Sequence, residues 1–141
     1  MSLHSIPAAG LRTIGQISIR HDAGFHPGQN GLAIAVQLLS SPIQGAPVVD
    51  TDGKFMGFIS EFDVLSALEA GRELSQLTAD ELMVKTHVSV SASCTIAEAV
   101  KIMKTKHLLV LPVEKDGVVI GCVTRQDLLR AWIGLGLGQN I

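Results

Sequence analysis

Two Ser/Thr-x-x-Asp motifs place a hydroxyl and a carboxylate three residues apart in this sequence. They are Ser60-x-x-Asp63 and Thr124-x-x-Asp127, and each opens a segment with helical apolar spacing. In a capping box of this spacing, the hydroxyl accepts a backbone N–H and the carboxylate lies at the positive end of the helix. Spacing alone therefore favours a structural role for both motifs, although a cap and a ligand contact can coexist on the same side chains.

A cation distinguishes the second motif from the first. Arg125 lies in the first helical turn, where the helix dipole opposes a positive charge. A guanidinium beside free backbone N–H groups forms an anion site, so this placement indicates phosphate binding. Glu61 stands at the matching position of the first motif and would repel phosphate. We therefore expect a phosphorylated ligand to prefer the second motif.

Three basic residues, Lys104, Lys106 and His107, precede the apolar run that ends at Val113. One interpretation is that they add positive potential to an anion site. The other is that they form a solvated helix end, where lysines complement the helix dipole. The sequence leaves both interpretations open.

Other site chemistries are not supported by residue spacing. The five histidines contain no HExxH-type pair and are expected to be solvated: His4, His21, His26, His87 and His107. The cysteines, Cys94 and Cys122, lack the spacing of a zinc site. The sequence also lacks a GxSxG elbow and a Walker-type phosphate loop. We therefore expect no metal site, no catalytic site and no required cofactor.

Each motif ends a strand–turn–strand unit that occurs twice. The first unit is Pro47–Ser60 around Asp52-Gly53, and the second is Pro112–Thr124 around Asp116-Gly117. An Asp-Gly pair between two apolar runs predicts a tight hairpin. The two hydroxyl residues are 64 residues apart, and so are the two aspartates. An internal repeat of this length predicts two copies of one structural unit.

The order Pro-Val, Asp-Gly and Gly-x-x-Ser/Thr-x-x-Asp, seen twice, resembles the cystathionine-β-synthase (CBS) domain, and a tandem pair of these domains is a Bateman module. The resemblance covers the chain from about Ile14 to Ile133. It implies an α/β fold of two βαββα CBS repeats, packed sheet to sheet about a pseudo-twofold axis. The implied boundaries are a lead-in at 1–13, repeat 1 at 14–71, a connector at 72–86, repeat 2 at 87–133 and a tail at 134–141.

The resemblance also implies a ligand and its binding residues. In CBS domains the corresponding Ser/Thr and Asp line the ligand cleft, where the aspartate holds the ribose hydroxyls; a carboxylate suits this role because it accepts from two donors. The implied ligand is an adenine nucleoside or nucleotide: AMP, ADP, ATP or S-adenosylmethionine. Val88, Val110 and Pro112 would form the apolar wall for the base. The whole implied set is Ser60, Asp63, Val88, Val110, Pro112, Thr124, Arg125 and Asp127.

Apolar spacing predicts the remaining elements. Residues 16–20 alternate as a short strand, and 21–31 form a loop. The i, i+4, i+7 spacing predicts buried helix faces, formed by Leu32, Val36 and Leu39 in repeat 1 and by Ile96, Val100 and Met103 in repeat 2. Thr78-x-x-Glu81 predicts a short turn in the connector, and residues up to about Arg12 are expected to be poorly ordered or to depend on a partner for their structure. The sheet faces expected to pack copy against copy are Val49, Phe55, Ile59, Leu111, Val113, Val119 and Val123.

Composition excludes several classes of partner. The 141 residues carry a formal net charge of −2, contain 4% aromatic residues and have no tyrosine. We therefore expect no binding to nucleic acid or to an anionic membrane. The longest apolar runs are too short to cross a bilayer, and no secretory leader is recognisable. These features predict a cytoplasmic protein.

The sequence thus favours a regulatory module that binds an adenine-containing small molecule and signals by a change of conformation or assembly. Its output would pass to an unidentified effector protein or through a homodimer. The apolar tail from Ile133 could serve a dimer contact or could cover the module's own core. The main alternative is a structural dimerisation module with empty clefts. A small enzyme is disfavoured, because no nucleophile and base can be assigned.

Overall fold

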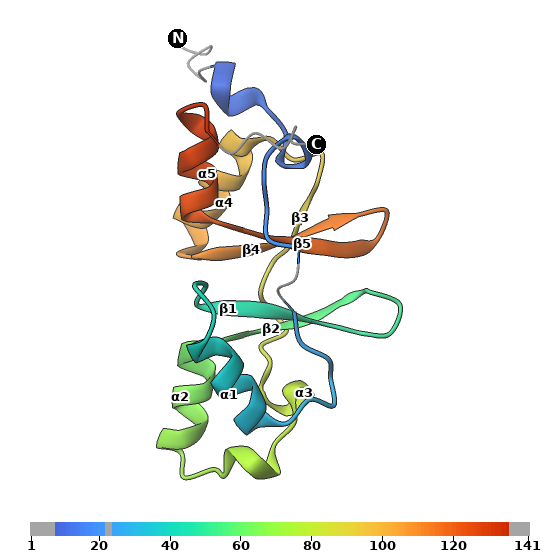
Figure 1. Cartoon of the computed structure of the whole chain (residues 1–141), viewed down its shortest axis with the longest axis vertical. Helices are drawn as coiled ribbons and strands as arrows, with labels where there is room; N and C mark the ends of the chain where they lie inside the picture. The colour runs from blue at the N-terminus through green and yellow to red at the C-terminus, as the bar shows by residue number, and fades with distance from the viewer. Residues whose placement is uncertain (1–7, 22–23, 136–141) are drawn as a thin grey trace.

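The computed structural model describes residues 8–21 and 24–135, which form two similar halves (Figure 1). Each half has a small β-sheet with helices on its outer side, and the two sheets lie next to each other in the middle of the molecule (Figure 1). The arrangement confirms the predicted α/β fold of two repeats packed sheet to sheet about a pseudo-twofold axis.

The elements of the two halves follow the same order. In the first half they are α1 (Gly31–Leu39), β1 (Gly45–Val49), β2 (Phe55–Ser60) and α2 (Glu61–Glu69). In the second half they are β3 (Val90–Ser91), α4 (Ile96–Lys106), β4 (Val110–Lys115), β5 (Val118–Thr124) and α5 (Arg125–Trp132). Strand β3 runs parallel to β4, and in the first half a single parallel bridge from Phe25 to Val48 takes the place of such a strand.

Both Asp-Gly pairs form the predicted hairpin turns. Gly53 has φ 81°, and Asp116 and Gly117 have φ 54° and 80°. Tight hairpin turns need such left-handed conformations, which glycine adopts without steric cost. The resulting antiparallel pairs place Ser60 opposite Gly45 and Thr124 opposite Val110. Both Ser/Thr-x-x-Asp motifs therefore lie at the same end of their sheets.

The segment that precedes each repeat packs on the other half of the molecule. Ile14 is buried in the core of the second half, and its backbone N–H donates to Cys94 O at 2.8 Å. The short helix α3 (Ala79–Leu82), in the connector, contributes to the core of the first half. Each segment has a cap in which an N3 side chain accepts from the N-cap backbone N–H, Gln16 from Thr13 at 2.9 Å and Glu81 from Thr78 at 3.0 Å. The chain therefore crosses between the halves twice.

Two predictions for the first twenty residues differ from the structure. Residues 16–20 do not form a strand, because Ile14–Gln16 is a 3-10 turn and Arg20 makes only an isolated bridge with Cys122. A second 3-10 turn, Ala8–Leu11, lies in the segment that was expected to be poorly ordered or partner-dependent. It packs on the other end of the chain, because a Cβ at Gly10 would lie 2.7 Å from the Trp132 ring. The rest of the predicted lead-in (1–7) and of the tail (136–141) lies outside the described residues.

Each half has its own apolar core, and a smaller cluster lies between the sheets. This third cluster contains Ile43, Phe58, Val110 and Cys122, with Phe55 packed against it. Of the residues expected between the sheets, Ile59 belongs to the first core, and Leu111, Val113 and Val123 belong to the second. Successive side chains of a strand point to opposite faces of the sheet. A predicted set of inward-facing residues that is shifted by one position therefore names the residues of the opposite face.

The buried face of α1 also differs from the prediction. Leu32, Val36 and Leu39 are 52%, 57% and 84% exposed, whereas Ile34 and Leu38 are buried. Because almost every residue of this helix is apolar, apolar spacing does not identify one face. In α4, whose other faces are polar, Ile96 and Met103 are buried as predicted.

Among the helices of the described ranges, none combines the length and the apolar character needed to span a membrane.

Candidate ligand-binding site

A cavity of ≈ 650 Å³ lies between the two halves and contains the first Ser/Thr-x-x-Asp motif. Its walls come from the start of α2, the end of α4, the start of β4 and the segment 84–88, which crosses between the halves before β3. We call residues 84–88 the crossing segment. We call this cavity the first cleft. Its volume falls within the range of about 300–1,000 Å³ that is usual for small-molecule sites.

Ser60 and Asp63 form the predicted capping box at one side of the first cleft. The Ser60 hydroxyl accepts from the Asp63 backbone N–H at 3.3 Å. One carboxylate oxygen, Asp63 Oδ2, accepts from Ser60 N at 2.7 Å and from Ser60 Oγ at 2.9 Å. The other oxygen, Oδ1, has no hydrogen-bond partner within the described part of the chain. A half-buried carboxylate is thus held in place by one oxygen and can accept from a ligand with the other.

His87 gives the first cleft an aromatic wall. Its ring stacks on Phe58, with the centroids 3.9 Å apart and the planes at 8°. Its Nε2 lies 2.9 Å from Val110 O, and because a carbonyl only accepts, Nε2 carries the hydrogen. Burial lowers the pKa of His87, so the ring is neutral at pH 7 and Nδ1 is an acceptor. The expectation of a solvated His87 is therefore wrong, because the ring packs on Phe58. The stacked ring offers a flat surface next to Val88 in the first cleft.

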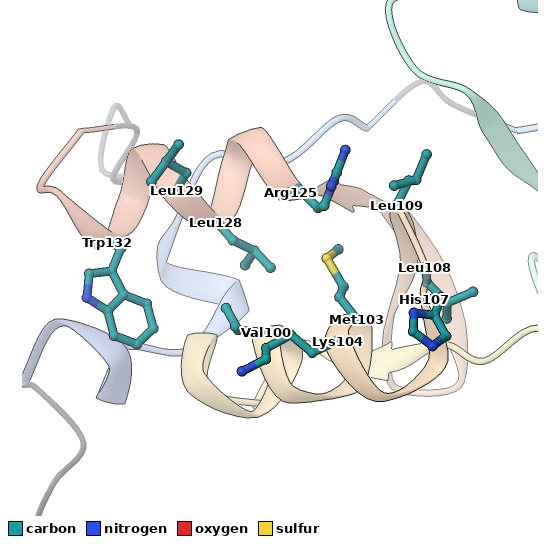
Figure 2. Close-up of a pocket in the computed structure, with 10 residues that line it drawn as sticks. All are labelled: Val100, Met103, Lys104, His107, Leu108, Leu109, Arg125, Leu128, Leu129 and Trp132. Atoms are coloured by element: carbon teal, nitrogen blue, oxygen red, sulfur yellow. The ribbon is translucent and has the colours of Figure 1, made fainter.

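The C-terminal end of α4 adds basic groups to the first cleft. Lys106 and His107 both line it, and His107 ends the helix in the left-handed conformation with φ 56°. Lys104 instead lines a separate groove between α4 and α5 (Figure 2). Of the two interpretations of this basic run, positive potential at a cleft thus fits Lys106 and His107, but the cleft is that of Ser60 rather than that of Arg125.

The pseudo-equivalent second cleft is small. It has a volume of ≈ 100 Å³, and its lining includes Arg20, Ile43, Thr124 and Arg125. Asp127 is only 6% exposed, and both of its oxygens are engaged. Its Oδ2 accepts from Thr124 N at 2.8 Å, and its Oδ1 pairs with Arg130 at 3.2 Å. The second motif thus caps α5 with a buried carboxylate whose two oxygens already have hydrogen-bond partners.

The structure divides the predicted binding set between the two clefts. Val88 and Val110 line the first cleft with Ser60, so they do not form an apolar wall beside Thr124. Pro112 is fully buried inside the molecule and does not line the first cleft. Val88 and Val110 lie beside the Ser60 motif because the repeats exchange segments across the interface.

Sequence reasoning missed Phe58 and His87 and assigned Lys106 to no particular cleft. These three residues come from β2, the crossing segment and α4, so no short spacing connects them. One signal in the sequence could have indicated His87. The crossing segment follows the connector directly, and a chain that passes from one sheet to the other at this point must run between the halves.

The two thiols have little nucleophilic character. Burial raises the pKa of Cys122 to about 12, and burial together with the nearby Glu98 carboxylate raises the pKa of Cys94. A thiolate is the reactive form, so both groups are poor nucleophiles at neutral pH. Within residues 8–21 and 24–135, no three His, Cys, Asp or Glu side chains lie close enough to hold a metal ion.

Comparison with known proteins identifies a family. The family model described as "CBS domain" matches residues 14–70 and 79–134. An uncharacterised protein of Methanopyrus kandleri is 28% identical over 120 residues, which cover 84% of this chain and 61% of that protein. The chain spans only 27% of arabinose 5-phosphate isomerase KdsD of Pseudomonas aeruginosa, with 33% identity over 87 residues. It thus covers less than two thirds of the length of these relatives.

Solved structures share the fold at low sequence identity. CBSX2 in complex with AMP has a TM-score of 0.74 at 23% identity, and the match covers 86% of this chain and 96% of that one. The CBS domain pair of MJ0100 in complex with 5′-methylthioadenosine and S-adenosylmethionine has a TM-score of 0.75 at 23% identity, covering 88% and 98%.

Proposed function

This chain belongs to the CBS domain family, and from that premise we propose that it binds an adenine nucleoside or nucleotide in the first cleft and acts as a regulatory module. CBS domain pairs are in general regulatory rather than catalytic. Regulation requires that the ligand bind one conformation or assembly more tightly than another. The output would be a change in self-association, as a homodimer, or in the binding of an effector protein.

The observation that carries this proposal is the difference between the two clefts. The first cleft offers ≈ 650 Å³ and the second ≈ 100 Å³, although both have a hydroxyl and a carboxylate at equivalent places. Only the first volume is large enough for a drug-sized ligand. The sequence-based preference for the Arg125 motif is therefore withdrawn in favour of the Ser60 motif.

The groups around the first cleft match the parts of an adenine nucleotide. Asp63 Oδ1 can accept from ribose hydroxyls, because its partner oxygen already fixes the carboxylate. The Phe58–His87 stack offers a flat aromatic surface for a base. Lys106 supplies a positive charge for a phosphate. A phosphorylated ligand such as AMP therefore suits the cleft better than the sulfonium of S-adenosylmethionine.

Two similar structures support an adenosine-containing ligand. CBSX2 was solved with AMP, and MJ0100 with 5′-methylthioadenosine and S-adenosylmethionine. These three ligands share the adenosine part and differ at the 5′ position. We therefore expect this chain to bind the adenosine part, and we expect Lys106 to select among the 5′ groups.

A thermal-shift panel tests the proposed ligand class. AMP, ADP, ATP, adenosine and S-adenosylmethionine would be compared with GMP as the control. A ligand that binds only the native state raises the melting temperature by mass action. We expect the adenine nucleotides to raise it and GMP to leave it unchanged. An unchanged melting temperature with every adenine compound would contradict the proposal.

A structural dimerisation module with empty clefts is the second candidate. It is favoured by the exposed apolar side chains of α1 and α2, among them Leu39 at 84% and Phe62 at 79% exposure. The thermal-shift panel distinguishes the two candidate functions. A structural dimerisation module would self-associate and its melting temperature would not respond to any nucleotide.

A further inference from the structure

The second cleft has a neighbouring cavity that is separated from it by a few side chains. The second cleft has a volume of ≈ 100 Å³, and the neighbouring cavity, which we call the adjacent cavity, has a volume of ≈ 280 Å³. Arg20, Pro42 and Ile43 line both of them. Residues that line two distinct cavities lie between them, so these three side chains form the partition.

The repeat shows that the second cleft and the adjacent cavity together correspond to the first cleft. Equivalent positions are 65 residues apart before the hairpin turn, as the N-caps Asn30 and Thr95 are, and 64 apart after it, as Ser60 and Thr124 are. At these offsets, residues that match the lining of the first cleft are divided between the two cavities. Ser40, Ser41 and Gly45 line the adjacent cavity, and Gln44, Thr124 and Gln126 line the second cleft.

Arg20 occupies the place that Val84 has in the first cleft. Arg20 N donates to Cys122 O at 2.9 Å, and Cys122 N donates to Arg20 O at 2.8 Å. Val84 and Phe58 make the same two backbone hydrogen bonds, at 2.8 and 2.9 Å. Arg20 and Val84 are 64 residues apart, and so are Cys122 and Phe58. A short aliphatic side chain thus lines the first cleft where a long cationic one stands in the second.

The backbone pairing directs the Arg20 side chain into the space between the sheets. Two residues that exchange both backbone hydrogen bonds in an antiparallel pair have their side chains on the same face. The Cys122 side chain belongs to the cluster between the sheets, so Arg20 extends toward that cluster as well. There, Arg20 Nε is buried and has no hydrogen-bond partner in the described part of the chain. A buried donor without a partner is unfavourable, so an arginine here costs stability.

We propose that the Arg20 side chain divides a second ligand-sized cleft and thereby restricts ligand binding to the first cleft. The first cleft, with Val84, is one cavity of ≈ 650 Å³. The divided volumes of ≈ 280 and ≈ 100 Å³ both lie below the range of about 300–1,000 Å³ that is usual for small-molecule sites. The effect on ligand stoichiometry rests on the proposed function, whereas the division of the cleft does not depend on any ligand.

Exchange of the two equivalent side chains tests this inference by calorimetric titration of AMP. Arg20→Val should join the two cavities and raise the stoichiometry from one AMP per chain to two. Adding Asp127→Asn to Arg20→Val should remove the second AMP and leave the first. Val84→Arg should divide the first cleft and weaken AMP binding by about tenfold or more. One AMP per chain in Arg20→Val, or weaker binding in that variant, would contradict the inference.

Two further variants control for charge and for folding. Arg72→Val removes an exposed arginine from the first half and should bind one AMP as wild type does. Arg20→Val should keep or raise the melting temperature, because it removes a buried donor that has no partner. Arg20→Ala removes the same side chain and should also bind two AMP molecules.

Thiol accessibility tests the division of the cleft without a nucleotide. Cys122 is fully buried on the face that Arg20 shares, and Cys94→Ser leaves it as the single thiol of the chain. In the Cys94→Ser background, N-ethylmaleimide should modify Cys122 on the order of tenfold faster after Arg20→Val, because the thiol then faces an open cleft. The rate should stay slow after Arg72→Val. Mass spectrometry follows the reaction.

The two readouts distinguish failure of this inference from failure of the proposed function. An unchanged rate of Cys122 modification in Arg20→Val would show that Arg20 does not close the cleft, whether or not AMP binds. Faster modification in a protein that binds no AMP would support the division by Arg20 and overturn the nucleotide ligand.

Discussion

At the scale of single residues, Asp63 and Asp127 show how one motif acquires two environments. Both form the capping box that the sequence predicts, because a cap depends on residues three positions apart. The oxygens of Asp127 are paired by local groups, the Thr124 N–H and the Arg130 guanidinium three residues further on, whereas the first repeat has Ser66 at the position that matches Arg130. The surroundings of each motif, such as His87 beside the first and Arg20 near the second, come from distant segments and could not be predicted.

Lys106 is predicted to select for a 5′-phosphate. Lys106→Glu should weaken the binding of AMP by about tenfold or more, because it replaces a charge-assisted contact with repulsion. The affinity for adenosine should change little, since adenosine has no phosphate. Isothermal calorimetry on both ligands measures the difference, and Lys54→Glu in the β1–β2 turn is the matched control. Equal losses for AMP and adenosine would mean that Lys106 does not contact the phosphate.

His87 predicts a pH dependence of stability. Its folded-state pKa is lowered by burial from the usual 6.5, so the unfolded chain takes up a proton at a higher pH than the folded protein does. The free energy of unfolding should therefore fall as the pH is lowered through 6.5. Urea denaturation at several pH values measures this slope.

Two variants separate the His87 contribution from that of other groups. His87→Gln should reduce the loss of stability at low pH, because no imidazole then gains a proton on unfolding. His26→Gln replaces an exposed histidine and serves as the matched control for the substitution. Identical slopes for wild type and His87→Gln would show that burial does not control this titration.

At the scale of elements, hairpins were predictable and helix faces were only partly so. The Asp-Gly turns and the connector turn at 79–82 follow from local chemistry and are present. The face of α1 was mispredicted because its sequence is apolar on all sides. The segment 16–20 was mispredicted because its alternation reflects packing of Ile17 on the other half rather than strand pairing.

Leu38 and Leu39 form a matched test of the α1 face. Leu38 is 4% exposed and Leu39 is 84% exposed, although they are neighbours. Leu38→Ala should lower the free energy of unfolding by about 2–5 kcal/mol through loss of burial and a cavity. Leu39→Ala should change it by less than about 0.5 kcal/mol. Denaturation must be followed at low protein concentration, because self-association adds to apparent stability. Equal losses would contradict the observed face.

Gly10 reports whether the lead-in packs on α5. Gly10→Ala would place a Cβ 2.7 Å from the ring of Trp132, the single tryptophan of the chain, so one of them must move. We expect a change in tryptophan fluorescence and a lower melting temperature. Gly28→Ala meets no atom within 4 Å and is the control. Identical fluorescence in both variants would place the lead-in away from Trp132.

At the scale of the whole molecule, the internal repeat predicts two packed halves but not the exchange of segments between them. The repeat length and the Pro-Val, Asp-Gly and Ser/Thr-x-x-Asp order were sufficient for the fold. The caps at Thr13 and Thr78 are also 65 residues apart, yet nothing local shows that each segment packs on the opposite half. That exchange decides which side chains surround each motif, and therefore which cleft is large enough for a ligand.

The most direct test of the account is a calorimetric titration of AMP into wild type, Asp63→Asn and Asp127→Asn. Both variants alter the same capping position, so any general effect of losing a carboxylate cap should be shared. The account predicts one AMP per wild-type chain, affinity reduced by about tenfold or more in Asp63→Asn, and near wild-type affinity in Asp127→Asn. Loss of binding in Asp127→Asn with full binding in Asp63→Asn would place the ligand in the second cleft and contradict the account.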